Sequence, residues 1–200
     1  MIDIETTGLD NEVDRVVSVA VVLVEDGRVI RESGRHVLVN PGIPVSPQST
    51  AVHGITDSDV ANSPPLDVAL TQLRPLLAGR TVVGHNLPFD LGFLPDVTAE
   101  RTLDTRSVSR LLWRWPATRH SLDAVAARVG IEPRDRHTAL GDAVATAEVL
   151  VACLPLLAAR GLDSPEAVAE AYAQNRARRS RVRRSRRRRV MRGLRPRNER

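Results

Sequence analysis

Two long runs of β-branched residues near the amino terminus limit the fold of this chain more than any other feature. Val13 to Glu25 and Arg28 to Val39 have the composition of strands, and Asp26-Gly27 between them is a strong hairpin turn signal. The sequence therefore predicts an antiparallel hairpin. The segment from Asn40 to Pro47 is rich in proline and glycine, so we expect a loop there.

Beyond this hairpin the chain alternates helical and strand patterns, which is typical of an α/β protein. A short apolar strand is expected over 81–84. Gly130 is expected to end the helix predicted over 122–129. Pro155 is expected to kink or split the long helix that opens at Ala139. Helices are predicted over 47–52, 65–77, 105–113, 122–129, 139–159 and 164–176. We expect one mixed sheet flanked by helices.

A pair of acids lies on one face of the first predicted strand. Ile2 and Ile4 alternate with Asp3 and Glu5, so the two carboxylates point the same way while the isoleucines enter a core. Neighbouring carboxylates repel, and a bound cation such as Mg²⁺ removes that penalty. An isolated pair of this kind is more often a solvated strand end, and only the remaining motifs favour a metal site.

Two later segments supply the other candidate ligands. Asp90 follows the strand at 82–84 and is expected on a helix, where Phe89 contributes to both core and substrate surface. We expect His85 and Asn86 to tie down the turn in between.

The third segment contains His137 and Asp142. Thr138 is a plausible N-cap, which leaves His137 in the loop and Asp142 in the first turns of the helix. An imidazole that titrates near neutrality can take a proton from a metal-bound water, while a fixed carboxylate holds the cation.

These three segments resemble the signature motifs of the DnaQ-like 3′→5′ exonucleases of the DEDDh subgroup, over roughly residues 1 to 160. Three shorter segments are similar to those of DNA polymerase III epsilon-type enzymes: Val52-His53-Gly54-Ile55-Thr56, Leu103-Asp104-Thr105 and His120-Ser121-Leu122-Asp123. The resemblance implies a ribonuclease H-like fold and release of nucleoside 5′-monophosphates from a free 3′ end, with DNA favoured over RNA.

The resemblance also assigns roles to individual residues. Asp3 would bridge two divalent ions, Mg²⁺ or Mn²⁺, with Glu5 and Asp142 on the first and Asp90 reaching the second. His137 would be the general base. The residues implied in substrate binding are Thr6, Thr7, Gly8, Leu9, His53 and Phe89. Gly8 also suits a tight turn, and the hydroxyls and amides of the two threonines are expected to be available as donors.

Composition fits a compact cytoplasmic enzyme. The chain has 200 residues with 42% hydrophobic content, and its one cysteine, Cys153, excludes a disulfide framework and is expected to be buried. The apolar stretch from Val16 to Val24 is too short for a membrane span, so no membrane association is expected.

Charge divides the chain sharply. Residues 1–175 carry a net charge of −8, and residues 176–200 hold 14 arginines and a net charge of +13. We expect an exonuclease domain over 1–160, a helix over 161–175 and a disordered tail over 176–200 that attracts phosphates or is simply solvated.

Two features depart from the resemblance. Only Met1 and Ile2 precede Asp3, so either the true start lies upstream or a short strand places a charged α-amino group near the metal site. The carboxyl-terminal region also shows no clear clamp-binding peptide, which leaves association with a DNA polymerase open.

Three functions remain as alternatives. The first is a DNA exonuclease of proofreading or repair type, and the second is an exoribonuclease that trims RNA ends. The third is a catalytically idle nucleic-acid-binding module. All five candidate catalytic residues are present, which favours an enzyme.

Overall fold

The predicted hairpin is present in the structure, a computed structural model that describes residues 1–113, 116 and 119–177. Strands β1 (Ile2–Thr6), β2 (Val16–Glu25) and β3 (Arg28–Leu38) form an antiparallel sheet in the order β1-β2-β3. The turn at Asp26 and Gly27 has φ values of 50° and 70°, which the glycine adopts without steric cost. The prediction placed the start of β2 too early, because residues 10–14 form a turn closed by the Asp14 amide on the Asp10 carbonyl.

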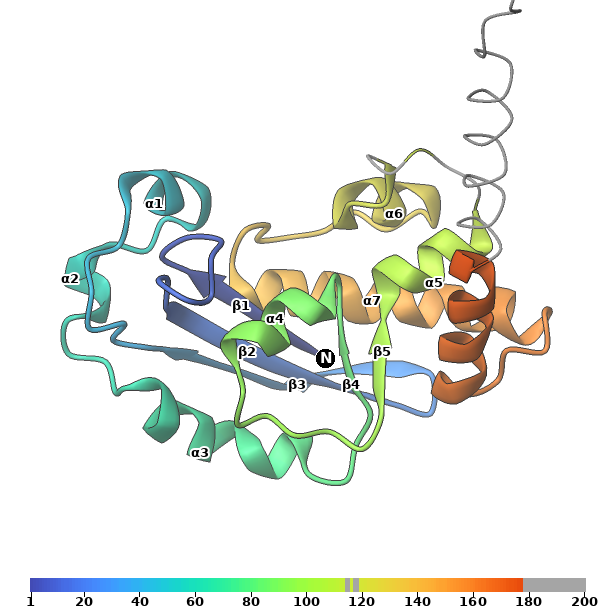
Figure 1. The fold of residues 1–200 in the computed structure, drawn as a ribbon, viewed down its shortest axis with the longest axis horizontal. Helices are drawn as coiled ribbons and strands as arrows, with labels where there is room; N and C mark the ends of the chain where they lie inside the picture. The colour runs from blue at the N-terminus through green and yellow to red at the C-terminus, as the bar shows by residue number, and fades with distance from the viewer. Residues whose placement is uncertain (114–115, 117–118, 178–200) are drawn as a thin grey trace, which may run out of the picture.

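A second sheet, of two parallel strands, lies beside β1, where one mixed sheet was expected (Figure 1). It consists of β4 (Val82–Gly84), which was predicted, and β5 (Thr102–Asp104), which was not. Gly84 lies so close to β1 that an added Cβ would be 3.3 Å from the Ile2 carbonyl oxygen. The carboxyl end of β4 is thereby held against the strand that carries Asp3.

The helices follow the predicted order, with small differences. They are α1 (Pro47–His53), α2 (Asp57–Val60), α3 (Leu66–Leu77), α4 (Leu87–Phe93), α5 (Thr105–Leu112), α6 (Leu122–Arg128) and α7 (Ala139–Ala158), and residues 165–177 are also helical. The sequence reading missed α2, a single turn closed by a capping box between Thr56 and Asp59. Helix α7 is not split at Pro155, because the proline lies in its last turn, where little helix remains to be interrupted.

The core lies on both faces of the central strand. Seven consecutive residues of β2, from Val16 to Val22, are buried, which requires cover on both sides of the sheet. Helix α7 packs on β1, β2 and β3, and α3 packs on β2 and β3 (Figure 1). This packing brings the first turn of α7 to the carboxyl end of β1, where the candidate ligands lie.

Helix α7 is also the one helix, within the described part of the chain, that is long and apolar enough to cross a membrane by length and composition. Half of its most apolar window is nevertheless buried against the rest of the molecule. Burial of Ala143, Ala147 and Cys153 against the sheet and neighbouring helices accounts for its apolar character. The sequence reading placed the longest apolar stretch in β2 and overlooked this helix.

The amino terminus is buried rather than solvated. The Met1 nitrogen donates a hydrogen bond of 2.5 Å to the Val22 carbonyl, and burial together with the nearby Arg80 lowers the pKa of this amine to about 6. The amine is therefore largely uncharged at neutral pH, so the alternative of a short first strand does not place a fixed positive charge beside the candidate site. A cavity of about 500 Å³ adjoins Met1 and is lined mainly by apolar residues of β2, β4, α3 and α7.

An extension ahead of Met1 is expected to stabilise the protein. Two valines would lie beside Leu23 and Val24, which extend β2 beyond its pairing with β1, and would fill part of the cavity. Burial of two such side chains is worth about 2 kcal/mol or more. Urea denaturation should show this gain for Val-Val and not for Gly-Ser, which displaces the amine equally without filling the cavity. Equal stability of the two extensions would contradict the prediction.

Candidate active site

The first two candidate ligands share a face of β1, as predicted. Along β1 the side chains of Ile2, Ile4 and Thr6 are buried, while Asp3 and Glu5 are partly exposed on the other face. The pairing of β1 with β2 shifts register between Glu5 and Thr6, and the strand ends at Thr6, one residue after the second acid. Both carboxylates therefore project at the end of a rigid element.

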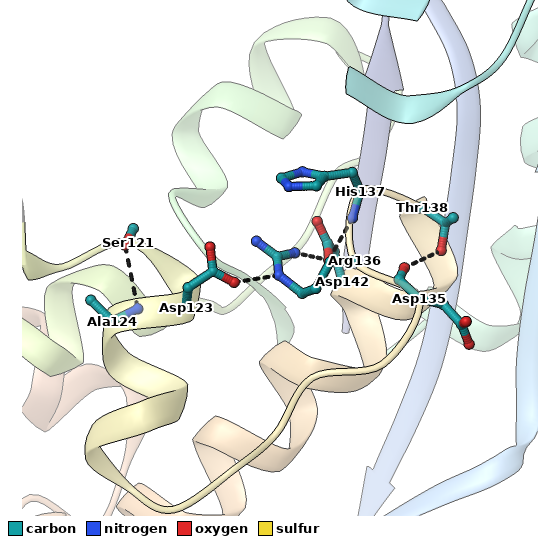
Figure 2. Close-up of polar contacts among 8 residues, drawn as sticks. All are labelled: Ser121, Asp123, Ala124, Asp135, Arg136, His137, Thr138 and Asp142. Carbon is teal, nitrogen blue, oxygen red and sulfur yellow. Dashed lines mark hydrogen bonds and ion pairs between the residues drawn. The ribbon is translucent and has the colours of Figure 1, made fainter. Parts of the chain in front are cut away.

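The third ligand comes from the start of α7. Thr138 caps the helix by accepting a hydrogen bond of 3.1 Å from the Gly141 amide. Asp142 lies in the first turn, beside Arg136 (Figure 2). Carboxylate oxygens of Asp3, Glu5 and Asp142 all lie within 4.8 Å of one another. Carboxylate oxygens are the ligands that hard divalent cations such as Mg²⁺ or Mn²⁺ prefer, so these three side chains could hold such an ion.

Asp90 lies next to this group without joining it. It projects from α4, its side chain is almost fully buried, and the Ile4 amide donates a hydrogen bond to its carboxylate. Beyond the effect of burial, its charge raises the pKa of Asp3 and the charge of Glu5 raises the pKa of Asp90, so Asp90 is close to both acids of β1. This position is suited to a second ion held mainly by Asp3 and Asp90.

The carboxylates have strongly perturbed acidities. Burial is the main cause of the raised pKa of Asp3, which lies well above its usual value, and the charges of Asp90 and Glu5 add to it. Burial likewise raises the pKa of Glu5 to about 7 and that of Asp90 to about 8. Without a cation these groups hold protons near neutral pH, so metal binding would release protons.

Arg136 was missed in the sequence and is part of this site. Its Nη1 forms an ion pair with Asp142, and its Nε donates a hydrogen bond of 2.5 Å to Asp123 of α6 (Figure 2). The guanidinium also lowers the pKa values of Asp3 and Glu5, against the larger effect of burial. The sequence shows only that a basic residue precedes His137, and this does not indicate that Arg136 contacts the carboxylates.

His137 lies in the loop before α7, as expected, but its ring is not part of the carboxylate group. The residue is exposed and adopts φ of 61°, a left-handed conformation that is uncommon outside glycine. Its backbone amide donates a weak hydrogen bond of 3.4 Å to Asp142. The structure thus brings together three of the five predicted catalytic residues, with Asp90 beside them and His137 on the adjoining loop.

The loop after β1 is tied by hydrogen bonds that the sequence did not reveal. The Thr6 hydroxyl donates to the Gly8 carbonyl and the Thr7 hydroxyl to Asp14, at 2.5 Å and 3.1 Å. The expectation that these hydroxyls are free donors is therefore wrong for this conformation. A Cβ on Gly8 would lie 2.3 Å from the Asp14 carboxylate, so close packing inside the loop requires the glycine.

The other residues implied in substrate binding differ in their exposure. Leu9 is 85% exposed, as a side chain that contacts a base must be before binding. His53 is buried: the Ile55 amide donates to its Nδ1 at 3.0 Å, which leaves Nε2–H to donate to the Thr6 carbonyl at 3.3 Å. Phe89 is partly buried against Phe93, with ring centroids 5.0 Å apart.

Hydrogen bonds of His85 and Asp104 fix the turn that precedes α4 and Asp90. His85 bridges the Thr105 hydroxyl and the His120 carbonyl, each at 2.9 Å, which confirms its predicted structural role. Asp104 caps α5 and also accepts a hydrogen bond of 2.8 Å from the Asn86 amide. The turn before α4, and with it Asp90, is therefore fixed by residues of β5 and α5.

Substitution of Gly141 by alanine is expected to disrupt the loop that precedes α7. An added Cβ would lie 2.1 Å from the Asp135 carbonyl oxygen, a backbone atom that cannot move without shifting the loop. Glycine to alanine ordinarily stabilises a helix by roughly 0.5–1 kcal/mol. Here we expect a loss of about 1–3 kcal/mol in unfolding free energy, as for other overpacked sites. A rise in thermal stability of Gly141→Ala would contradict the observed packing.

The fold and the carboxylate group together define an exonuclease of ribonuclease H-like architecture. The chain belongs to the exonuclease family described by the RNase_T model, which matches residues 1–150. This match and the epsilon-like relative described below confirm the predicted relationship to the DnaQ-like exonucleases and the expected class of enzyme.

Relatives and solved structures agree with this assignment. The chain is 42% identical over 176 residues to a DNA polymerase III subunit epsilon-like protein of Rhodobacter capsulatus, covering 83% of this chain and 25% of that protein. It is 30% identical over 170 residues to the PolC-type DNA polymerase III of Thermotoga petrophila, covering 81% of this chain and 12% of that protein. The chain thus spans a quarter or less of these curated relatives.

Among solved structures, exonuclease X in complex with 5′ overhanging duplex DNA matches with a TM-score of 0.66 and 28% identity, covering 86% of this chain and 97% of that one. Escherichia coli exonuclease I in complex with a dT13 oligonucleotide has the same TM-score at 17% identity, covering 80% of this chain and 42% of that one. The second match supports the fold alone.

Proposed function

We propose that this protein is a metal-dependent 3′→5′ exonuclease that removes nucleoside 5′-monophosphates from the 3′ end of DNA. The observation that supports this most is the meeting of Asp3, Glu5 and Asp142 within 4.8 Å, from two elements far apart in sequence. Buried Asp90 beside them is suited to help hold a second ion. Two divalent ions in this site would stabilise the attacking and leaving oxygens of an in-line displacement.

The chain's own residues carry the remaining roles. His137, on the loop before α7, would accept the proton of the attacking water, and its exposure leaves it free to turn toward a bound 3′ end. Leu9, on the exposed loop after β1, would contact the terminal base. The loop between β1 and β2 would position the terminal nucleotide through its backbone, since its threonine hydroxyls are already bonded.

DNA is the favoured substrate because the 28% identical exonuclease X structure contains duplex DNA and spans nearly the same length. RNA stays an alternative: a 3′-exonuclease that recognises histone mRNA stem-loops shares the fold at 18% identity and a TM-score of 0.64. The third alternative, an idle binding module, is disfavoured by the presence of a complete ligand set.

Association with a DNA polymerase and a cytoplasmic location are further parts of the proposal. The polymerase partner is suggested by the names of the matching relatives, of which this chain covers a small share. Of the arginine-rich tail predicted over 176–200 to attract nucleic acid, residues 176 and 177 continue the last helix, and residues 178–200 lie outside the described residues.

The test compares 3′-labelled and 5′-labelled single-stranded DNA and RNA with Mg²⁺ or Mn²⁺. Stepwise shortening of the 5′-labelled strand, with immediate release of the 3′ label as a mononucleotide, is expected, and faster on DNA. Loss of this activity in Asp3→Ala would tie it to the site. Equal activity in wild type and Asp3→Ala would indicate a contaminant, and shortening from the 5′ end would overturn the proposal.

A further inference from the structure

We propose that Arg136 is a built-in counterion of the metal-free site, which leaves Asp142 when a divalent cation binds and is then retained by Asp123. This inference rests on the proposed metal-dependent function and concerns how the same site changes between its free and loaded states. It assigns a role to a residue outside the ligand set, on the loop that also carries the proposed general base.

The position of the guanidinium motivates the proposal. Arg136 pairs with Asp142, the α7 carboxylate that also lies within 4.8 Å of Asp3 and Glu5. Both side chains are largely shielded, with 21% and 13% of their surface exposed. Three acids this close repel one another when ionised, and a cation is the group that offsets that repulsion. In the free site the guanidinium supplies that charge.

A metal ion and the Arg136 guanidinium compete for the carboxylate of Asp142. The Asp142 oxygen that pairs with Arg136 Nη1 also accepts the hydrogen bond from the His137 amide. A dication bound by Asp3, Glu5 and Asp142 would lie close to the guanidinium and repel it. This repulsion favours release of Asp142 from Arg136 when the ion binds, and the free energy of the pair then opposes metal binding.

Asp123 gives the displaced arginine a partner. It projects from α6 with 62% of its side chain exposed and already accepts the Arg136 Nε–H at 2.5 Å (Figure 2). Arg136 can thus give up one carboxylate while it keeps the other, so its charge stays paired after the metal enters. Only the end of the side chain has to move.

The release of Asp142 by Arg136 would also affect the neighbouring residue, His137. His137 has a positive φ of 61°, and its amide shares the Asp142 oxygen with Arg136. Release of Asp142 from Arg136 loosens the contacts that hold this strained conformation. Metal loading and the orientation of His137 are therefore coupled through one carboxylate.

The experiment is calorimetric titration of the full chain with Mn²⁺, compared among wild type, Arg136→Gln and Arg134→Gln. Removal of the counterion is expected to tighten Mn²⁺ binding about tenfold, the size expected for loss of one charge-assisted pair. Arg134, an exposed arginine two residues away in the same loop, controls for the change in net charge, and its substitution should change affinity less than about twofold.

Thermal melts give a second readout. In chelator Arg136→Gln should melt below wild type, and Mn²⁺ should raise its melting temperature by more than it raises that of wild type. Arg136→Lys keeps the charge but cannot form both contacts at once, so it should tighten binding by less than the glutamine variant. This variant keeps the proposal falsifiable if Arg136→Gln does not fold.

The outcomes separate this inference from the function on which it rests. Asp3→Asn tests the metal site itself and should abolish Mn²⁺ binding in either background. Wild-type binding that depends on Asp3, with equal or weaker affinity in Arg136→Gln, would overturn the counterion role and leave the site intact. Absence of Mn²⁺ binding in every variant would overturn both.

Discussion

Asp3→Asn is expected to lower kcat on a DNA oligonucleotide by roughly a thousandfold or more. Asp3 belongs to the group with Glu5 and Asp142, and the charge of Asp90 acts on it, so its loss is expected to affect both proposed ion positions. The substitution keeps the side-chain volume and removes a group whose burial is unfavourable when ionised. Stability in chelator should therefore be unchanged or higher.

The control for this prediction is Asp67→Asn. Asp67 is an exposed acid on α3, far from the site in sequence, and its loss changes the net charge equally. Its kcat should be within about twofold of wild type, as for most surface substitutions. His137→Ala tests the proposed base, with an expected loss of roughly 10²–10⁴-fold and of the titration near neutral pH. A full-rate Asp3→Asn enzyme would refute the assignment of the site.

The stability of the metal-free protein is expected to fall as pH rises from about 5 to 8, with Glu5 as one identifiable cause. The pKa of Glu5 is about 7 in the folded protein against 4.5 in the unfolded chain. Between these values the folded state binds more protons, so a rise in pH favours unfolding. The shift corresponds to at most about 3 kcal/mol, lost progressively as pH rises through this window.

A comparison of Glu5→Gln with wild type at several pH values isolates the contribution of Glu5 to stability. The buried Met1 amine has its pKa lowered from 8.0 to about 6, so it acts in the opposite direction and stabilises the fold as pH rises from 6 to 8. Glu5→Gln leaves the amine in place and cannot ionise. In chelator its advantage over wild type should grow between pH 5 and pH 8, and Mn²⁺ should remove that advantage. An advantage independent of pH would contradict the burial of the Glu5 charge.

Much of the fold could be predicted because the relevant signals are local. The hairpin at Asp26-Gly27 and the cap at Thr138 each depend on a few adjacent residues, and both are found where the sequence placed them. The three-residue strand β5 has no pattern of its own and exists because it pairs with β4. The start of β2 was misplaced because a hydrogen-bonded turn at Asp10 and Asp14 replaces strand pairing there.

In the candidate site, too, features set by adjacent residues could be predicted and contacts between distant residues could not. Alternation along β1 predicted that Asp3 and Glu5 share a face, and the resemblance to the exonucleases implied that Asp142 joins them, as it does. The contact of Arg136 with Asp123 and Asp142 joins side chains of three successive elements, and no pattern in one sequence reports such a contact. The same holds for His53, whose ring nitrogens are both bonded within the fold.

Anomalous diffraction from crystals soaked in Mn²⁺ is the most direct test of whether the carboxylates of β1 and α7 bind divalent ions. We expect one peak bounded by Asp3, Glu5 and Asp142, a second near Asp3 and Asp90, and Arg136 withdrawn to Asp123. Well-ordered carboxylates with no anomalous peak among them at saturating Mn²⁺, and Arg136 still paired with Asp142, would contradict this expectation.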